Sequence, residues 1–230
     1  MTLLRVLEPE VMDSEQEAAD YDAIDNQEVN DRFCADLLAV APMPRRALDV
    51  GTGTALVPIA LCRRSPFVQV VAIDMAQAML SAAQVNIERA GLAARISLCR
   101  RDAKSTGYAA GSFDVVLCNS IIHHIPEPLA ALAEMLRLVE PGGVLFVRDL
   151  VRPASAAELQ ALVDLYAPVA EDGAAAQKAM QRRQRDLFAA SLHAALTLQE
   201  VRDLAGLLGA ASVAVNMTSD RHWTLIARAR

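Results

Sequence analysis

The sequence predicts a single α/β domain with a parallel β-sheet that helices cover on both faces. Short apolar runs typical of strands alternate with segments whose apolar residues recur at helical spacing, and the connections are short. Such alternation favours parallel strands with a helix in each crossover. The five expected parallel strands lie at 46–50, 68–73, 95–99, 113–118 and 143–148, and the helices between them at 55–64, 76–90 and 128–139.

The C-terminal part predicts an antiparallel hairpin. Apolar runs at 211–217 and 223–228 flank the short polar connection Thr218-Ser219-Asp220-Arg221. Thr197 and Glu200 have the spacing of a capping box, which predicts a short helix ending between Gly206 and Gly209. The expected sheet therefore has seven strands.

Helices are expected on either side of this alternating core. Apolar residues between 26 and 41 recur at steps of three and four, and Pro42 and Pro44 end that pattern. An acidic run at 13–25 precedes it. From 153 to 191 the chain is alanine-rich and helical, with a break near 171–173.

Composition narrows the class of protein. The chain has 230 residues, 53% of them hydrophobic, which is enough for one substantial core. Its formal charge of −6, without a basic stripe, favours a small-molecule partner over nucleic acid. No signal-peptide pattern and no membrane-spanning apolar run is evident, so we expect a cytoplasmic protein without membrane association. The scattered cysteines predict reduced, buried thiols: Cys34, Cys62, Cys99 and Cys118.

The turn after the first strand predicts a nucleotide-like ligand. Gly51 and Gly53 can adopt backbone conformations closed to other residues, and they leave no Cβ between the chain and a ligand. The helix that follows directs its first amide groups at that ligand. Asp74 lies 23 residues after Gly51, at the end of the second strand, where a carboxylate suits a ribose diol. The sequence therefore predicts an adenosine-type ligand.

In its order of motifs the chain resembles the class I S-adenosylmethionine-dependent methyltransferases of the small-molecule type. The motifs are Leu48-Asp49-Val50-Gly51-Thr52-Gly53, Asp74-Met75, Asp102-Ala103, the run 113–120 and the run 138–145. The resemblance implies a Rossmann-like methyltransferase fold: a seven-stranded, mostly parallel sheet with an antiparallel C-terminal hairpin, helices on both faces and a helical cap. It divides the single domain 1–230 into an N-terminal cap (1–41), a cofactor-binding core (45–150), a cap insertion (151–196) and a final helix and hairpin (197–230).

The resemblance also implies the cofactor, S-adenosyl-L-methionine, and the residues that hold it. Asp49 would bind the amino-acid portion, Asp74 the ribose hydroxyls, and Met75 would pack on the adenine. Asp102 and Ala103 would receive the adenine amino group beside a backbone donor. The full set of expected cofactor-binding residues is Tyr21, Asp49, Gly51, Thr52, Gly53, Asp74, Met75, Asp102, Ala103, Asn119 and Ser120.

Two departures from the family pattern bear on the substrate. Ala55 stands near the place of the usual third glycine, and a residue this small still fits. The tetrapeptide of the Asn-Pro-Pro-Tyr type, found in enzymes that methylate nucleobase or glutamine nitrogens, is replaced by Asn119-Ser120-Ile121-Ile122. The sequence therefore favours a small-molecule acceptor.

His123, His124 and Asp149 are the candidate catalytic residues. A histidine could supply the base that an oxygen or nitrogen nucleophile needs, or the pair could be structural or line the cofactor site. Asp149 ends the fifth strand, where ligands of open parallel sheets bind. No metal is expected, because adjacent side chains diverge on a regular element and no matching acid cluster is visible in the sequence.

The predicted reaction is methyl transfer to an O, N, C or S atom of a partly apolar small molecule. One alternative is an NAD(P)-dependent oxidoreductase, because the glycine turn and Asp74 would also serve that cofactor. Asp49, Asp102 and the terminal hairpin argue against it. The other alternative is a cofactor-binding subunit without catalytic activity. The oligomeric state is left open, a homodimer included.

Overall fold

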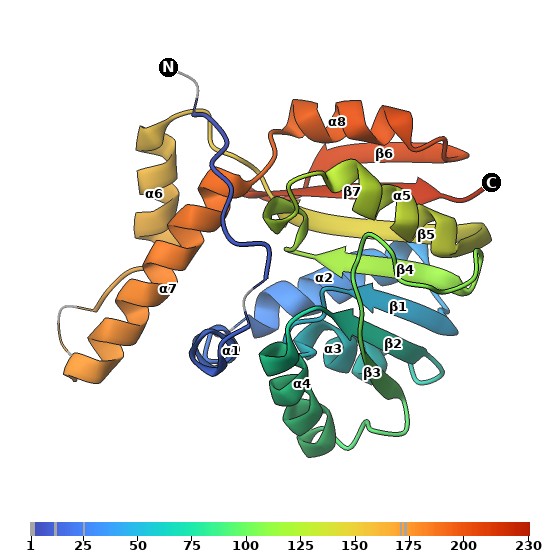
Figure 1. The fold of residues 1–230 in the computed structure, drawn as a ribbon, viewed down its shortest axis with the longest axis horizontal. Coiled ribbons are helices and arrows are strands. Elements are labelled where there is room, and N and C mark those ends of the chain that lie inside the picture. Colours follow the sequence, from blue (N-terminus) through green and yellow to red (C-terminus); the bar gives the residue numbers. More distant parts are fainter. Residues whose placement is uncertain (1–2, 12, 25, 171, 173) are drawn as a thin grey trace.

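The computed structural model describes residues 3–11, 13–24, 26–170, 172 and 174–230, and it has one seven-stranded sheet in the order β3-β2-β1-β4-β5-β7-β6 (Figure 1). β7 pairs antiparallel with both β5 and β6, and every other pairing is parallel. The predicted mostly parallel sheet with its C-terminal hairpin is confirmed. The strands are β1 Arg46–Val50, β2 Gln69–Asp74, β3 Ile96–Arg100, β4 Phe113–Asn119, β5 Val139–Leu150, β6 Ser212–Met217 and β7 His222–Arg228.

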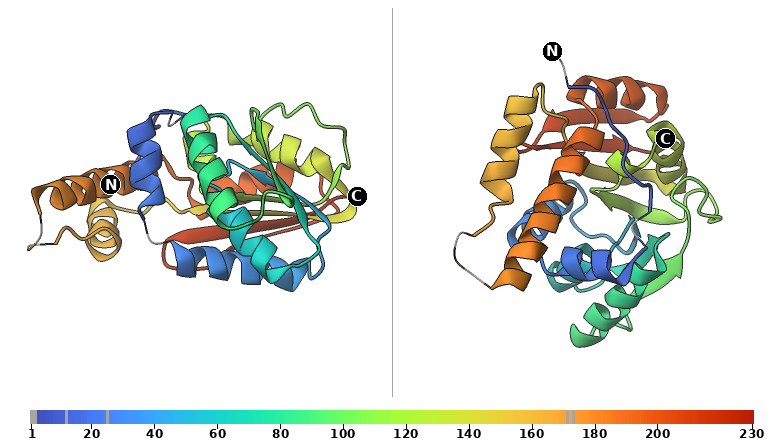
Figure 2. Two further views of the ribbon diagram at one scale, coloured as in Figure 1. Left: turned by 90° about the horizontal axis from the view of Figure 1, so that it is seen from below. Right: turned by 60° about the vertical axis from the view of Figure 1, so that its left-hand side comes forward.

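Helices cover both faces of the sheet (Figure 2, left). One apolar cluster joins the sheet to α2 (Gln27–Val40), α3 (Leu56–Arg64) and α4 (Gln77–Arg89). The other joins it to α5 (Pro128–Leu138) and α8 (Leu198–Leu207). Successive residues of β1 divide between them, Ala47 in the first cluster and Leu48 in the second, because side chains alternate across a strand.

Three further helices lie beyond the carboxyl ends of the parallel strands, on the left in Figure 1: α1 (Glu15–Asp22), α6 (Ala156–Tyr166) and α7 (Ala175–Ala194). α6 and α7 share a small core in which Leu159, Val163 and Leu192 pack with Leu150 of β5. The Arg183 guanidinium donates to both carboxylate oxygens of Asp20, at 2.6 and 3.0 Å, and so joins α7 to α1. These helices correspond to the predicted cap.

α2 differs from the expected N-terminal cap over 1–41, because it lies on the sheet. Its Phe33 and Leu37 are fully buried, and the Phe33 ring meets the Phe146 ring edge-on with centroids 5.0 Å apart. Burial of this apolar face places α2 beside α3. Only α1 and the segment before it belong to the cap.

β5 is longer than predicted. It begins at Val139, directly after α5, and its pairing with β4 shifts register between Phe113 and Val115. Residues 140–142, expected to connect the helix to the strand, are thus part of β5. Gly143 is needed there, because a Cβ would lie 2.6 Å from the carbonyl oxygen of Asp114. Of the break expected near 171–173, residues 171 and 173 lie outside the described part of the chain.

Within the described residues, no helix has the length and apolar character needed to cross a membrane.

Candidate functional site

An open cleft lies at the carboxyl ends of β1, β2 and β4. It encloses about 790 Å³ of empty space, including the solvent at its mouth. The strand order reverses between β1 and β4, and ligands of open α/β sheets bind at such a switch point. Its walls come from the N-terminal segment, α1, the glycine turn, β2, the loop after β3 and the end of β4: Glu10, Val11, Tyr21, Val50, Gly51, Gly53, Ile73, Asp74, Met75, Ala76, Met79, Arg101, Asp102, Ala103, Lys104, Asn119, Ser120, Ile121, His124 and Ile125.

The glycine turn forms the floor of this cleft. Gly51 and Gly53 have φ values of +73° and +53°, which side-chain-bearing residues rarely adopt. The amides of Gly51 and Thr52 both donate to the carbonyl oxygen of Ile73, at 2.9 Å, and tie the turn to β2. A Cβ on Gly51 would lie 2.3 Å from an Ile121 side-chain carbon. The turn is therefore packed closely against the loop after β4.

Asp74 ends β2 beside this turn. Its carboxylate accepts hydrogen bonds from the Gly53 amide at 2.8 Å and the Ala76 amide at 2.9 Å, one on each oxygen. Each oxygen keeps a second lone pair, so two further donors can bind. Burial raises the pKa of Asp74, although these amide hydrogen bonds oppose the shift. A ribose diol supplies the two hydroxyl donors that this carboxylate can still accept.

Asp49 lies in β1 behind the glycine turn and is not among the residues of the cleft wall, and neither is Thr52. The Asp49 carboxylate is almost fully buried, and its Oδ2 has no hydrogen-bond partner among the described residues. Burial raises the pKa of Asp49 to about 7; the Thr52 hydroxyl beside the carboxyl opposes this shift and the charge of Asp74 adds to it. An unsatisfied buried carboxylate oxygen is costly, so the site favours a ligand that brings a cationic donor.

The wall opposite the turn suits a purine. Met75 and Ala103 offer apolar surface, while the half-exposed Asp102 accepts from the Lys104 amide at 2.8 Å. Tyr21 reaches the cleft from α1 and lies 3.5 Å from the place that a Cβ on Gly53 would take. Burial raises the pKa of Tyr21 to about 12, so its hydroxyl keeps its proton at neutral pH.

Asn119 and Ser120 also reach the cleft, at the end of β4. Ser120 has a φ of +58°, one of only two positive values among the described residues other than glycine. Its amide donates to the carbonyl oxygen of Arg148 at 2.9 Å, which holds this conformation. Backbone strain of this kind occurs at ligand sites when the surroundings enforce it.

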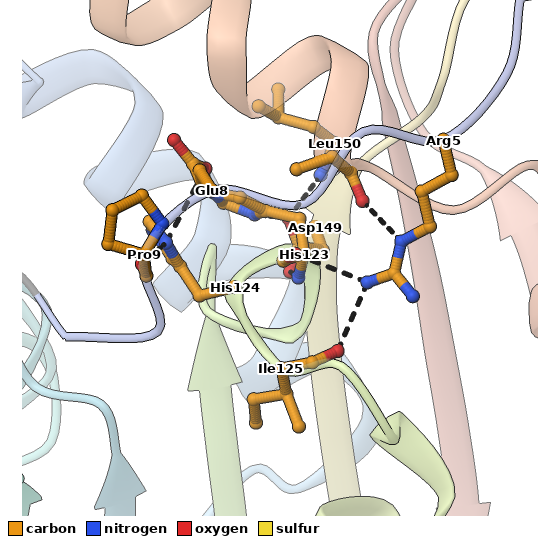
Figure 3. Close-up of polar contacts among 9 residues, drawn as sticks. Arg5, Glu8, Pro9, His123, His124, Ile125, Asp149 and Leu150 are labelled. Atoms are coloured by element: carbon orange, nitrogen blue, oxygen red, sulfur yellow. Dashed lines mark hydrogen bonds and ion pairs between the residues drawn. The ribbon is translucent and has the colours of Figure 1, made fainter.

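The two histidines lie in the short 3-10 helix η1 (Ile122–His124) and have different surroundings (Figure 3). His124 lines the cleft, whereas His123 and Asp149 are buried beside it and do not. His123 Nδ1 lies 2.6 Å from Asp149 Oδ1, and the His123 amide donates to Asp149 Oδ2 at 3.1 Å. Of the three candidate catalytic residues, only His124 reaches the space that a ligand would occupy.

Their protonation differs as well. Burial acts to lower the pKa of His123, but the charges of Asp149 and Glu8 raise it overall. Burial also acts to raise the pKa of Asp149, and the His123 charge lowers it overall. Burial and the charge of His123 lower the pKa of His124 to about 4. His123 and Asp149 thus hold each other in a buried hydrogen bond, next to a His124 whose pKa is low.

The N-terminal segment contributes residues that the sequence did not predict. Arg5 donates to the carbonyl oxygens of Ala194 at 2.7 Å, His123 at 3.2 Å and Ile125 at 3.1 Å (Figure 3). Glu8 lies against both histidines, and Glu10 pairs with Lys104 at the cleft. No motif marks these residues, since they become neighbours of the site only when the segment crosses the ends of the strands.

Comparison with known proteins agrees with this geometry. A family model described as a methyltransferase domain matches residues 48–147, which run from β1 through most of β5. The central part of the chain, from β1 into β5, is thus similar to methyltransferase domains. The chain is 37% identical over 124 residues to a demethylmenaquinone methyltransferase of Deinococcus radiodurans, a match that covers 54% of the chain and 51% of the relative. It is 35% identical over 114 residues to a ubiquinone biosynthesis O-methyltransferase of Xanthomonas oryzae pv. oryzae, covering 48% of the chain and 45% of the relative.

The chain thus spans only about half the length of these curated methyltransferases. Among solved structures, an S-adenosylmethionine-dependent methyltransferase of Aquifex aeolicus superposes with a TM-score of 0.67 at 16% identity, covering 94% of this chain and 98% of that one. At this identity the likeness establishes the shared fold. S-adenosylmethionine is the cofactor of such methyltransferases, and two features fit it: the lone pairs of Asp74 at the cleft and the unsatisfied Asp49 oxygen behind the glycine turn.

Proposed function

We propose that the protein transfers the methyl group of S-adenosylmethionine to an O, N, C or S atom of a partly apolar small molecule. The observation that carries the proposal is the pairing of Asp74 and Asp49 across one glycine turn. Asp74 has free lone pairs for a diol, and Asp49 has a buried oxygen without a donor. An adenosyl amino acid supplies ribose hydroxyls that can donate to Asp74 and an ammonium that can donate to Asp49.

The bound cofactor supplies an activated methyl group on a sulfonium, so the protein's main tasks are alignment and desolvation. Asp74 holds the ribose, and Asp102 with Ala103 and Met75 holds the adenine end. Asp49 binds the ammonium through the turn, directly or through water. Tyr21 closes the cleft over the donor. The bound donor would supply its methyl group to the nucleophilic atom of the acceptor, with the carbon–sulfur bonding pair leaving on sulfur as S-adenosylhomocysteine, and a proton carried by that atom would pass to solvent.

We assign the contact with the acceptor to His124, because it alone of the three candidate catalytic residues lines the cleft. His123 and Asp149 are better described as positioning residues, since their mutual contacts hold η1 against the end of β5. Because His124 is the next residue of η1, these contacts also fix the position of its backbone.

The acceptor class follows from the cleft and from the relatives. Val11, Met79, Ile121 and Ile125 give one part of the wall an apolar surface. Two relatives are named for the methylation of demethylmenaquinone and for O-methylation in ubiquinone biosynthesis. A hydroxylated aromatic ring or quinol with an apolar substituent suits both observations. The net charge of −6 disfavours nucleic acid, and the four free cysteines suit action in the cytoplasm.

The first test is calorimetric titration with S-adenosylmethionine, S-adenosylhomocysteine, NAD and NADP, followed by a screen for S-adenosylhomocysteine release. We expect micromolar binding of the two sulfur ligands and turnover with a phenolic or quinol acceptor. Binding of NAD or NADP instead would overturn the proposal in favour of an oxidoreductase. Tight binding of S-adenosylmethionine without turnover on oxygen, nitrogen, carbon or sulfur acceptors would favour the subunit without catalysis.

The pKa of Asp49 predicts how the affinity for S-adenosylmethionine depends on pH. Below its pKa of about 7 the carboxyl is neutral, and above it the carboxylate attracts the ammonium of S-adenosylmethionine. The affinity should therefore fall as the pH is lowered through 7, by roughly 5- to 10-fold between pH 7.5 and pH 6, although the α-amino group becomes more fully charged over the same range. Calorimetry across this range provides the measurement.

Two controls isolate the Asp49 carboxylate. Asp49→Asn should bind more weakly at pH 7.5 and show little pH dependence. 5′-Methylthioadenosine lacks the amino-acid portion, so its affinity for the unchanged protein should vary little over the same range. Equal pH dependence for the two ligands would refute the assigned contact.

A further inference from the structure

A cluster of three ligand-type side chains lies at the edge of the cleft. Glu8 comes from the N-terminal segment, and His123 and His124 come from η1 (Figure 3). One ligand atom from each lies within 4.8 Å of the others. The adjacent histidines converge here because η1 is a short, tight turn: Nε2 of His123 and Nδ1 of His124 face the same carboxylate. In the metal-free structure His124 Nδ1 also lies 3.3 Å from the Pro9 carbonyl oxygen, a contact that a metal ion would replace.

Two of the three distances in this cluster, those from Glu8 to the histidines, match a tetrahedral metal ion better than they match hydrogen bonds, and the third pair of atoms lies within 4.8 Å. Glu8 Oε1 lies 3.4 Å from His123 Nε2 and 3.4 Å from His124 Nδ1. Ligands at about 2.0–2.1 Å from a tetrahedral zinc ion are about 3.3–3.4 Å apart. Good hydrogen bonds to a carboxylate are about 2.7–2.9 Å long. The carboxylate oxygen is thus at ligand–ligand distance from both nitrogens.

The Glu8 oxygen is also unsatisfied. Its side chain is only 10% exposed, and Oε1 has no hydrogen bond of acceptable geometry among the described residues. Ser191 of α7 interacts with the Glu8 carboxylate, and Arg5 directs its guanidinium at backbone carbonyls of η1. A buried carboxylate oxygen without a partner is costly, and a cation would remove that cost.

A metal-binding histidine usually donates a hydrogen bond from its second ring nitrogen to a carboxylate or carbonyl oxygen, and Asp149 is the acceptor here. It lies 2.6 Å from His123 Nδ1, on the side of the ring opposite Glu8. A proton on Nδ1 donated to Asp149 leaves the Nε2 lone pair directed at Glu8. Such a carboxylate–histidine–metal arrangement sets the tautomer and the orientation of the ring.

The charges of the cluster also suit a divalent cation. Glu8 and Asp149 place two carboxylates around two imidazoles, while Arg5 lies on the far side of η1 against carbonyl groups. With both histidines neutral, a divalent ion balances the two carboxylates. Two nitrogen ligands and one oxygen ligand suit zinc rather than magnesium or calcium.

We propose that Glu8, His123 and His124 form a three-ligand site for a divalent metal ion of the zinc type, with Asp149 as the residue that positions His123. Three protein ligands leave a fourth position for water or another oxygen ligand, as in catalytic rather than structural zinc sites. Because His124 lines the cleft, the ion lies at the wall of the space proposed for the methyl donor. The site itself does not depend on the proposed methyl transfer.

The test is metal binding to the purified full chain after treatment with a chelator. We expect one zinc ion per chain by mass spectrometry, competition with a chromophoric chelator, and a visible absorption spectrum of tetrahedral type when cobalt(II) replaces zinc. Glu8→Gln and His124→Gln should each weaken zinc binding more than about 100-fold. Asp149→Asn should weaken it about 10- to 100-fold, as the loss of an outer contact does.

Matched controls separate this site from other donors. Glu10→Gln changes the neighbouring acid, which pairs with Lys104, and His222→Gln changes a histidine that contacts Ser219. Both should bind zinc as the unchanged protein does. S-adenosylhomocysteine binding and circular dichroism, measured on every variant, report folding and the proposed cofactor site independently of the metal.

A folded, chelator-treated protein that binds neither zinc nor cobalt at micromolar concentrations would overturn the proposal. So would zinc binding that Glu8→Gln and His124→Gln leave unchanged, because the ion would then lie elsewhere, for example at a cysteine. A loss in only one of these two variants would overturn the three-ligand assignment. Failure of cofactor binding with intact metal binding would instead contradict the proposed function.

Discussion

Asp74→Ala is expected to weaken S-adenosylmethionine binding by at least about 100-fold. The Asp74 carboxylate has one lone pair left on each oxygen after it accepts from the Gly53 and Ala76 amides. A hydrogen bond to a charged group contributes about 1.5–3 kcal/mol, so two ribose hydroxyls account for about 3–6 kcal/mol. That range corresponds to roughly a 10²- to 10⁴-fold change in affinity. Titration calorimetry on the variant and the unchanged protein measures it.

Asp74→Asn serves as the matched variant. Asparagine keeps one acceptor oxygen and loses the charge, so its affinity should fall between those of Asp74→Ala and the unchanged protein. Denaturant unfolding of the ligand-free variants shows how much of the effect comes from the released Gly53 and Ala76 amides. An Asp74→Ala protein that is folded and binds the cofactor within about threefold of the original would contradict the ribose contact.

Gly51→Ala is expected to destabilise the protein by about 2–5 kcal/mol and to weaken cofactor binding. Its φ of +73° costs about 1–2 kcal/mol for a residue with a Cβ. The added Cβ would also lie 2.3–2.9 Å from three Ile121 side-chain carbons, and overpacking of this kind typically costs 1–3 kcal/mol. Urea unfolding monitored by circular dichroism measures the sum of these two costs as the loss in free energy of unfolding.

Gly91→Ala separates the two contributions. Gly91 has a φ of +68°, but a Cβ there would meet no atom within 4 Å, so only the backbone cost of about 1–2 kcal/mol should appear. Adding Ile121→Ala to Gly51→Ala removes the three crowded carbons and should return part of the lost stability. Equal losses for Gly51→Ala and Gly91→Ala would show that the Ile121 contact is unimportant.

The cofactor cleft could be predicted because its parts are local. Gly51 and Gly53 follow a buried strand directly, and Asp74 ends the next one. Neighbouring parallel strands bring their carboxyl ends to one edge of a sheet, so the positions of these residues in their strands place them together. The capping box of Thr197 and Glu200 could be predicted because it is local as well: its hydrogen bonds span only three residues.

The roles of His123 and His124 depended on the tertiary structure. The sequence offered both as candidate bases, and it could not tell which ring reaches the cleft. Asp149 holds His123 away from the cleft and leaves His124 on its wall. Asp149 is 26 positions from His123 in the chain, and the two meet only because β4 and β5 are adjacent in the sheet.

The acidic neighbour of the histidines could not be found in the sequence for a related reason. Glu8 lies 3.4 Å from both rings, although 115 positions separate it from His123. No periodicity or motif in the first ten residues indicates where that segment runs. α2 was likewise expected in the cap, and its position on the sheet follows from the burial of Phe33 against Phe146.

The sequence by itself thus determined the fold class, the glycine turn and the acid that lies beside it, because each depends on periodicity or on short spacing along the chain. Only the tertiary structure decided which histidine lines the cleft, and that Glu8, His123 and His124 share one point beside it. Those contacts join segments far apart in the chain. Their geometry is set by the packing of the whole domain, which no local pattern encodes.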